Sequence, residues 1–179
     1  MKSIQSNIKK AKKYLDNNHC VAVPTETVYG LAANAYSNSA VMKIFSLKKR
    51  PLNNPLIVHY YNINRLKRAL HEIDIVIHAA AIKHVPVVEY NPFEAVKTNI
   101  IGSQNVIDAS LAEDVEICVC VGTDKGVAPL NTYGASKLLM ERLFVSASNY
   151  LNPIRHKTKF IAVRYGNVLG SNGSVVPKS

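Results

Sequence analysis

The fold of this chain is decided by the run Ile73-Asp74-Ile75-Val76-Ile77, which has the length and apolar character of a buried strand and ends in small residues. Similar runs and helical patterns alternate after it, with strands expected at 115–121 and 160–165 and helices at 91–111 and 132–150. Buried strands that alternate with helices form a parallel sheet with right-handed crossovers. The sequence therefore predicts an α/β domain over residues 71–179.

The first of these helices has a strong start signal at Asn91-Pro92-Phe93-Glu94. Asn is a good N-cap residue, and Pro suits the first helical position. A Glu three residues after the cap can return a hydrogen bond to the backbone of the cap. We therefore expect a capping box at residues 91–94.

Residues 1–70 follow a different pattern. Apolar residues recur there at helical spacing and predict an amphipathic helix over residues 4–16, with an apolar face made of Ile4, Ile8, Ala11 and Leu15. Further elements are expected as strands at 20–23 and 56–60 and as helices at 39–47 and 62–70, the last of them capped by Asn62. The two patterns meet near residue 70 without a Gly/Ser linker, which predicts domains at 1–70 and 71–179.

The positive charge of the chain is unevenly distributed. The formal net charge is +10, and residues 1–70 carry all of the excess, with 12 Lys+Arg against 2 Asp+Glu (12 − 2 = +10). Residues 71–179 carry 10 of each kind (10 − 10 = 0). This asymmetry suggests that the first part binds polyanions such as nucleotides or RNA. Solvated lysine-rich helix faces explain it equally well.

Several classes of protein are disfavoured by what the sequence lacks. The chain has 3 cysteines without a Cys-x-x-Cys spacing, so a disulfide framework or a zinc site is not expected. Cys118 and Cys120 alternate on an expected strand and are predicted to lie in the core. No apolar run is long enough for a membrane span, and no apolar stretch follows the N-terminal lysines as in a signal peptide. We expect a cytoplasmic protein with no membrane partner and leave its oligomeric state open.

The segment Tyr133-Gly-Ala-Ser-Lys137 places a tyrosine and a lysine one helical turn apart. A nearby ammonium favours the phenolate and lowers the pKa of a tyrosine, so Tyr133 could act as a base at neutral pH. By itself the spacing is a weak signal, since most such pairs lie on solvated helix faces. Thr123-Asp124-Lys125 follows an expected strand at its carboxyl end, where open α/β sheets place their sites.

In their order along the chain, these segments resemble the extended short-chain dehydrogenase/reductase superfamily. Within it they are most similar to the inverting UDP-N-acetylglucosamine 4,6-dehydratases and the capsular polysaccharide biosynthesis group. The resemblance covers about residues 73–177 and implies a partial Rossmann-like fold. It is carried by the stretches His78–Pro86, Tyr90–Asn99, Thr123–Lys137 and Arg164–Pro177.

The resemblance implies a role for each residue of the catalytic set. Tyr133 would deprotonate the 4-hydroxyl of a UDP-sugar substrate while NADP or NAD takes the hydride. Lys137 would hold the cofactor ribose and tune Tyr133, and Thr123 would hydrogen-bond the sugar 4-oxygen. Asp124 and Lys125 would serve as acid and base for the elimination of water.

The resemblance also implies residues that shape the two binding sites. The small residues Ala79 and Ala80 would let the cofactor approach the sheet, and the cofactor and substrate sites would be shaped by Asn99, Tyr165 and Asn167. Lys83 is a further candidate for substrate contact, whereas His84 is better explained as a surface or packing residue.

Two departures from this family pattern bear on function. Gly122 stands where the family usually has serine before Thr-Asp-Lys, which suggests a looser loop. The glycine-rich pattern Gly-x-Gly-x-x-Gly occurs nowhere in the 179 residues. That pattern normally cradles the cofactor pyrophosphate, so weak binding of NADP or NAD is expected.

A second resemblance concerns the first part of the chain. Pro24-Thr25-Glu26-Thr27-Val28-Tyr29-Gly30-Leu31 offers hydroxyls, a carboxylate and a glycine after a strand, and Lys48-x-Arg50 could grip a phosphate. Over residues 4–68 these segments resemble the threonylcarbamoyl-AMP synthases, α/β proteins that act in tRNA modification. The resemblance implies binding of ATP and double-stranded RNA, a threonine and nucleotide pocket near Thr25, Thr27 and Tyr29, and contacts from Lys48 and Arg50 to ATP phosphate and carbonate oxygens.

Together these observations predict a fusion of two truncated parts joined near residue 70. The first functional hypothesis is NAD(P)-dependent 4,6-dehydration or 4-epimerisation of UDP-N-acetylglucosamine in polysaccharide biosynthesis, by a lyase-like enzyme. The alternatives are a threonylcarbamoyl-AMP synthase-like fragment that binds nucleotide or RNA, and an inactive product of fused genes.

Overall fold

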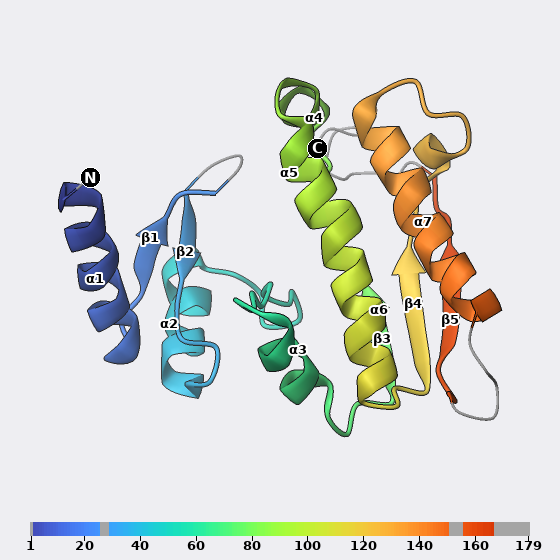
Figure 1. The fold of residues 1–179 in the computed structure, drawn as a ribbon. Coiled ribbons are helices and arrows are strands. Elements are labelled where there is room, and N and C mark those ends of the chain that lie inside the picture. Colours follow the sequence, from blue (N-terminus) through green and yellow to red (C-terminus); the bar gives the residue numbers. More distant parts are fainter. Residues whose placement is uncertain (1, 26–28, 151–155, 167–179) are drawn as a thin grey trace. The chain divides into compact units, whose positions relative to one another are not determined.

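The structure is a computed structural model that describes residues 2–25, 29–150 and 156–166 (Figure 1). The chain divides into two compact units, Met1–His59 and Tyr60–Ser179, and each is described by itself. The sequence places a boundary near residue 70, after helix α3 (Ile63–Leu70). In the structure α3 lies in the second unit instead, because it packs against helix α6 (Gly102–Ala112).

In its described residues, 2–25 and 29–59, the first unit consists of two helices and a short antiparallel hairpin. Its elements are α1 (Lys2–Asp16), β1 (Val21–Val23), β2 (Gly30–Ala32) and α2 (Asn38–Lys48). Val21 pairs with Ala32 and Val23 with Gly30. The hydroxyl of Ser37 caps α2 by accepting a hydrogen bond from the backbone N–H of Ala40.

One expectation for this unit is confirmed and one is wrong. The amphipathic helix expected over residues 4–16 is α1, although its apolar face is only partly covered, since Ile4 and Ile8 are each 62% exposed. Residues 56–60, expected as a strand, pair with no strand within the described part of the chain, and Ile57 is 80% exposed. An apolar run forms a strand only where a neighbour satisfies its backbone groups.

The second unit is built on a three-stranded parallel sheet, as the sequence predicts. The strands are β3 (Ile75–His78), β4 (Ile117–Val121) and β5 (Lys159–Val163), in that order. Ile75 lies opposite Ile117, which in turn lies opposite Lys159. The carboxyl ends of all three strands therefore lie at the same edge of the sheet.

The helices of this unit lie mainly between β3 and β5 along the chain. After α3 they are α4 (Val85–Tyr90), α5 (Pro92–Ala95), a π-helical turn (Val96–Ile101), α6 and α7 (Thr132–Tyr150), with a short 3-10 turn at Asp124–Gly126. Asn62 caps α3 as expected, because its side-chain oxygen accepts from the N–H of Arg65. Helix α4 is absent from the sequence expectations.

The long helix that starts at Pro92 begins where expected, but without the capping box. The Asn91 side chain makes no capping hydrogen bond. The Glu94 carboxylate instead accepts from Lys97 at 3.0 Å. A lysine one turn further along the helix thus replaces the cap backbone as the partner of Glu94.

The core of the second unit lies between the sheet and two helices that cover one of its faces. Figure 1 shows α6 and α7 side by side over the strands. Cys118 and Cys120 point into this core with no exposed surface, as their alternation predicts. They pack there with Met140, Phe144 and Phe160.

The start of α7 is fixed by contacts from three other segments. The Glu89 carboxylate accepts from the N–H of Thr132 at 2.6 Å, and the Asn131 side chain accepts from the N–H of Gly134 at 2.8 Å. A Cβ atom on Gly134 would lie only 2.5 Å from the carbonyl oxygen of Lys125. Glycine is therefore required where α7 meets the turn after β4.

His78 ends β3 and is buried in the core. Its ring stacks on Phe144, with the centroids 5.7 Å apart, and its Nε2 lies 2.8 Å from the hydroxyl of Ser103. Burial lowers the pKa of His78 from 6.5 to about 4, and the charge of Lys137 adds to this effect. The ring is therefore neutral in the folded protein at physiological pH.

This buried histidine predicts a loss of stability in acid. Between pH 6.5 and 4 the unfolded chain binds a proton at His78 that the folded chain does not, so the unfolding free energy falls as the pH falls. The shift corresponds to a loss of up to about 3 kcal/mol. Urea unfolding at pH 7 and 4.5 measures this loss of unfolding free energy.

The His78→Gln variant should lose much of this pH dependence of stability. His84→Gln, a matched change at an exposed histidine, should keep it. Equal pH dependence in both variants would contradict the assignment of the effect to His78.

Candidate active site

Most of the catalytic residues inferred from the sequence gather at the carboxyl edge of the parallel sheet. Thr123, Asp124 and Lys125 follow β4 directly, and Tyr133 lies in the first turn of α7. Two backbone hydrogen bonds extend the β4–β5 pairing to this point, from Gly122 N–H to Val163 O at 2.7 Å and from Asp124 N–H to Tyr165 O at 3.1 Å. The turn that carries the polar side chains is therefore tied to the sheet on one side and to α7 on the other.

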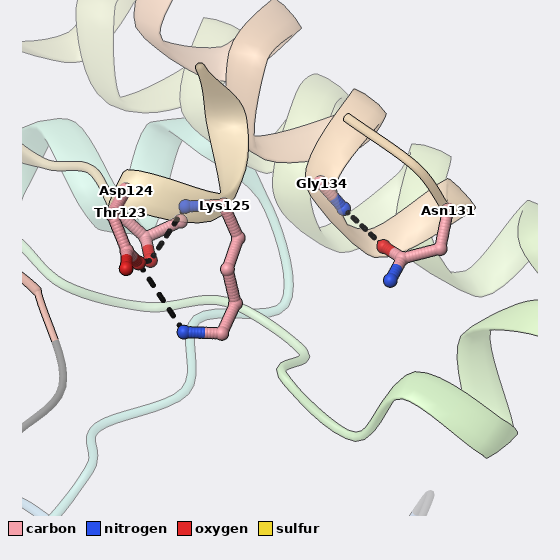
Figure 2. Close-up of polar contacts among 5 residues, drawn as sticks. All are labelled: Thr123, Asp124, Lys125, Asn131 and Gly134. Carbon is pink, nitrogen blue, oxygen red and sulfur yellow. Dashed lines mark hydrogen bonds and ion pairs between the residues drawn. The ribbon is translucent and has the colours of Figure 1, made fainter. Parts of the chain in front are cut away.

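The three residues after β4 form a local hydrogen-bonded cluster (Figure 2). The Thr123 hydroxyl donates to Asp124 Oδ1 at 2.9 Å, and Lys125 Nζ donates to the same oxygen at 3.2 Å. The hydrogen bond from Thr123, followed by that from Lys125, holds the pKa of Asp124 below its usual range. Asp124 is therefore an exposed, ionised carboxylate with a cation beside it.

Tyr133 is 8% exposed and lies close to Thr123 and Tyr165. Burial raises the pKa of the Tyr133 phenol, and Tyr165 adds to this rise, whereas a hydrogen bond with Thr123 opposes it. The sequence predicts a lowered pKa for Tyr133 from the neighbouring Lys137. This prediction is wrong, because the Lys137 ammonium donates to Val121 O and the cost of burying a phenolate outweighs the hydrogen bond with Thr123.

Lys137 lies one turn further along α7 and is also buried. Its ammonium donates to the carbonyl oxygen of Val121 at 2.9 Å and lies 3.8 Å from the sulfur of Met140. Burial lowers the pKa of this ammonium. The lysine is thus directed to the end of β4, at the same edge as Thr123, where its side chain is shielded from solvent.

The residues expected to shape the binding sites differ in their surroundings. Ala79 and Ala80 follow β3 and are exposed, as are Lys83 and His84. Asn99 has no exposed surface, and both ends of its amide are bonded to protein groups. Asn99 therefore connects the segment after β3 to α7, and its role in shaping a binding site stays a prediction.

Two further positions concern β5 and the segment after it. Tyr165 is exposed beside Tyr133, while Asn167 lies outside the described residues. A Cβ atom on Gly122 would lie 2.9 Å from Val163 O. The glycine at 122 therefore permits a close approach of β5 to the end of β4 and does not indicate a loose loop.

The candidate residues of the first unit do not form the expected phosphate grip. Lys48 is exposed in the last turn of α2, but the Arg50 guanidinium donates to Asn54 O at 2.9 Å and to Asn54 Oδ1 and Pro55 O at 2.7 Å each. Arg50 thus organises its own loop. Thr25 and Tyr29 are exposed beside the hairpin, and Thr27 lies outside the described residues.

Sequence reasoning missed several residues that build this site. Asn131 has a readable signal, since an Asn three residues before Gly134 can cap a helix. Glu89 has none, because its contact with Thr132 spans 43 residues of sequence. Ser136 was equally hidden, since its partner Asn99 lies on a different helix.

Two kinds of feature are absent from the described residues. No group of three or more His, Cys, Asp or Glu side chains there could hold a metal ion. No helix in that part of the chain combines the length and apolar content needed to cross a membrane.

Known proteins similar to this chain include two that bear the names of sugar-nucleotide enzymes and one that is named a membrane protein. A UDP-N-acetylglucosamine 4,6-dehydratase (inverting) of Campylobacter jejuni is 55% identical over 113 residues, 63% of this chain and 33% of the relative. A UDP-glucose 4-epimerase of Rickettsia bellii is 45% identical over 130 residues, 70% of this chain and 38% of the relative. An uncharacterised membrane protein of Methanocaldococcus jannaschii is 57% identical over 114 residues, 64% of this chain and 34% of the relative. The chain thus spans about a third of the length of these relatives.

Solved structures share the fold. Pen from Bacillus thuringiensis is 43% identical with a TM-score of 0.64, over 78% of this chain and 43% of that one. A UDP-glucose 4-epimerase from Brucella ovis in complex with NAD has a TM-score of 0.54 at 21% identity, over 62% of this chain and 37% of that one. The α/β unit with its parallel sheet therefore has a partial Rossmann-like fold.

The family model described as polysaccharide biosynthesis protein matches residues 27–179. This match begins inside the stretch 4–68 that resembles threonylcarbamoyl-AMP synthases, and none of the comparisons given above supports that second resemblance or a fusion. Because the model covers most of the sequence, the chain belongs to the polysaccharide biosynthesis protein family.

Proposed function

We propose that this chain carries the catalytic residues of an enzyme that removes water from UDP-N-acetylglucosamine by NAD(P)-dependent 4,6-dehydration. The observation that carries the proposal is the convergence of Thr123, Asp124, Lys125 and Tyr133 at one edge of the sheet. The Campylobacter jejuni relative bears the name of this activity.

The geometry suggests how the first step would be divided among the residues. Thr123 and Tyr133 lie close enough for a hydrogen bond, so both hydroxyls could meet the 4-oxygen of a sugar. Tyr133 would accept the proton of that hydroxyl. A raised pKa makes the phenol a stronger base once it has lost its proton, and a cation at the site would favour that loss.

The elimination of water would use the neighbouring pair of Asp124 and Lys125. Lys125 Nζ lies 3.2 Å from Asp124 Oδ1, so a proton can pass between the two side chains. One member would take a proton from the sugar while the other gives a proton to the departing hydroxyl. Both are about half exposed, which leaves them accessible to a substrate.

A nicotinamide cofactor, when bound, would accept hydride from the sugar C4 and return it to the sugar later in the reaction, so that dehydration removes only water and epimerisation leaves the mass unchanged. The small exposed side chains of Ala79 and Ala80 leave room for such a group at the end of β3, and Lys137 would hold its ribose. The N-terminus of α7 is not a phosphate site in this arrangement, since Glu89 and Asn131 already accept its N–H groups.

The runner-up activity is 4-epimerisation, the name borne by the Rickettsia bellii relative. Both reactions would begin with the same oxidation at C4 and would share Tyr133 and Thr123. The acid–base pair of Asp124 and Lys125 favours elimination, because epimerisation removes no water from the sugar.

The assigned base predicts a large effect of one phenolic oxygen. Tyr133→Phe keeps the ring but removes the proton acceptor, so turnover of UDP-N-acetylglucosamine with NADP or NAD should fall at least about 10²-fold. The control is Tyr90→Phe at an exposed tyrosine, which should turn over like the parent. Unchanged turnover in Tyr133→Phe would rule out this base, and no turnover in the parent chain would favour an inactive product.

The two candidate reactions are separated by their products. Dehydration gives a sugar nucleotide lighter by one water, whereas epimerisation leaves the mass unchanged, so mass spectrometry decides between them. Asp124→Asn and Lys125→Met should each reduce water loss by about 10²-fold or more. Lys97→Met, at an exposed lysine that also pairs with a carboxylate, is the matched control. A product of unchanged mass in the parent would support epimerisation instead.

A further inference from the structure

A chain of buried side-chain hydrogen bonds runs through the second unit from β3 to α7. It begins at His78, whose Nε2 lies 2.8 Å from Ser103 Oγ. The Ser103 hydroxyl donates to the backbone oxygen of Asn99 at 2.6 Å. Since its proton is used there, the Ser103 oxygen accepts from His78, and the neutral histidine carries its proton on Nε2.

The next member of this chain, Asn99, lies in the π-helical turn that interrupts the long helix. Its Oδ1 accepts from the N–H of Ile82 at 2.8 Å, and its Nδ2 donates to Ile82 O at 3.2 Å and to Ser136 Oγ at 2.9 Å. Single π-helical turns are frequent at functional sites. Here the turn supplies an amide that joins the segment after β3 to α7.

Ser136 is the last side chain in this series of hydrogen bonds, and it connects the series to Tyr133, the candidate base. Its hydroxyl accepts from Asn99 and donates to the backbone oxygen of Tyr133 at 2.8 Å. Ser136 is 5% exposed, so water does not readily replace either partner. The position of the Tyr133 peptide is thereby linked to a buried amide on another helix.

We propose that Ser136 is a positioning residue, which transmits the buried Asn99 contact to Tyr133 and so holds the phenol beside Thr123. The catalytic meaning of this role rests on the proposed function, but the positioning itself does not. The sequence pattern of Tyr133 and Lys137 gives Ser136 no role of its own.

The alternative is that Ser136 is simply a satisfied polar group in the core. Ser110 provides a matched comparison, since it is fully buried on α6 and its hydroxyl donates to Cys118 Sγ at 3.5 Å. The hydrogen bonds described for Ser110 are with Cys118 and Val115, neither of which belongs to the series that ends at Tyr133. A general effect of removing a buried hydroxyl should appear at both serines, whereas positioning of Tyr133 should appear only at Ser136.

The test is a pH titration of the Tyr133 phenol in the full chain. It is monitored by NMR of protein labelled with carbon-13 at the tyrosine ring carbon that bears the hydroxyl. The Tyr133→Phe variant identifies the resonance. Burial is the main cause of the raised pKa of Tyr133, so loosening the start of α7 should move that pKa back toward its ordinary value. We expect a fall of about half a unit or more in Ser136→Ala.

The controls decide between the two explanations. Ser110→Ala should leave the Tyr133 titration unchanged, and Ser136→Thr, which keeps the hydroxyl, should preserve the parent pKa. If Ser136→Ala does not fold, Ser136→Cys gives the same test, because a thiol keeps the volume but forms weak hydrogen bonds. An unchanged Tyr133 pKa in the folded Ala or Cys variant would overturn the proposal, as would an equal shift in Ser110→Ala. The titration needs neither substrate nor cofactor, so absent turnover would count against the proposed function alone.

Discussion

The structure of the second unit depends on the close approach of Gly134 to the carbonyl oxygen of Lys125. A side chain at 134 would bring a carbon to 2.5 Å from that oxygen, a distance that packed atoms do not adopt. Because glycine occupies this position, the first turn of α7 can lie directly on the turn after β4. The helix then carries Tyr133 and Lys137 to the strand end that carries Thr123, and every catalytic proposal for this chain assumes that contact.

The sequence predicted those parts of the fold that depend on local pattern. The parallel sheet follows from apolar runs of strand length, and the core positions of Cys118 and Cys120 follow from their alternation. The expectation that the first run is a buried strand is wrong, since Ile75 and Ile77 of β3 are 56% and 69% exposed. The cap of α3 by Asn62 needs only residues one turn apart. The strand expected at 56–60 is wrong because a strand depends on a partner that the local sequence does not specify.

The sequence predicted which residues lie near one another at the sheet edge better than it predicted their pKa values. Adjacent residues such as Thr123 and Asp124 necessarily lie together, whereas the hydrogen bond between them is seen only in the structure. The direction of the Tyr133 pKa was wrong because burial depends on distant segments. The contacts of Arg50 with the loop that follows it were likewise not predicted, and its contact with a phosphate stays a prediction. In the first unit, RNA or nucleotide binding stays a prediction based on charge alone.

The contact at Gly134 is tested most directly by adding one methyl group. Gly134→Ala should lower the unfolding free energy of the second unit, measured by hydrogen exchange of the β4 amides, by about 1–3 kcal/mol, as overpacked sites do. Gly102→Ala is the matched control, because its Cβ would lie 3.5 Å from Lys97 O in ordinary contact and alanine favours a helix. A stable Gly102→Ala beside a destabilised Gly134→Ala is the expected result. A Gly134→Ala protein as stable as Gly102→Ala would contradict the packing of α7 on which the proposed site depends.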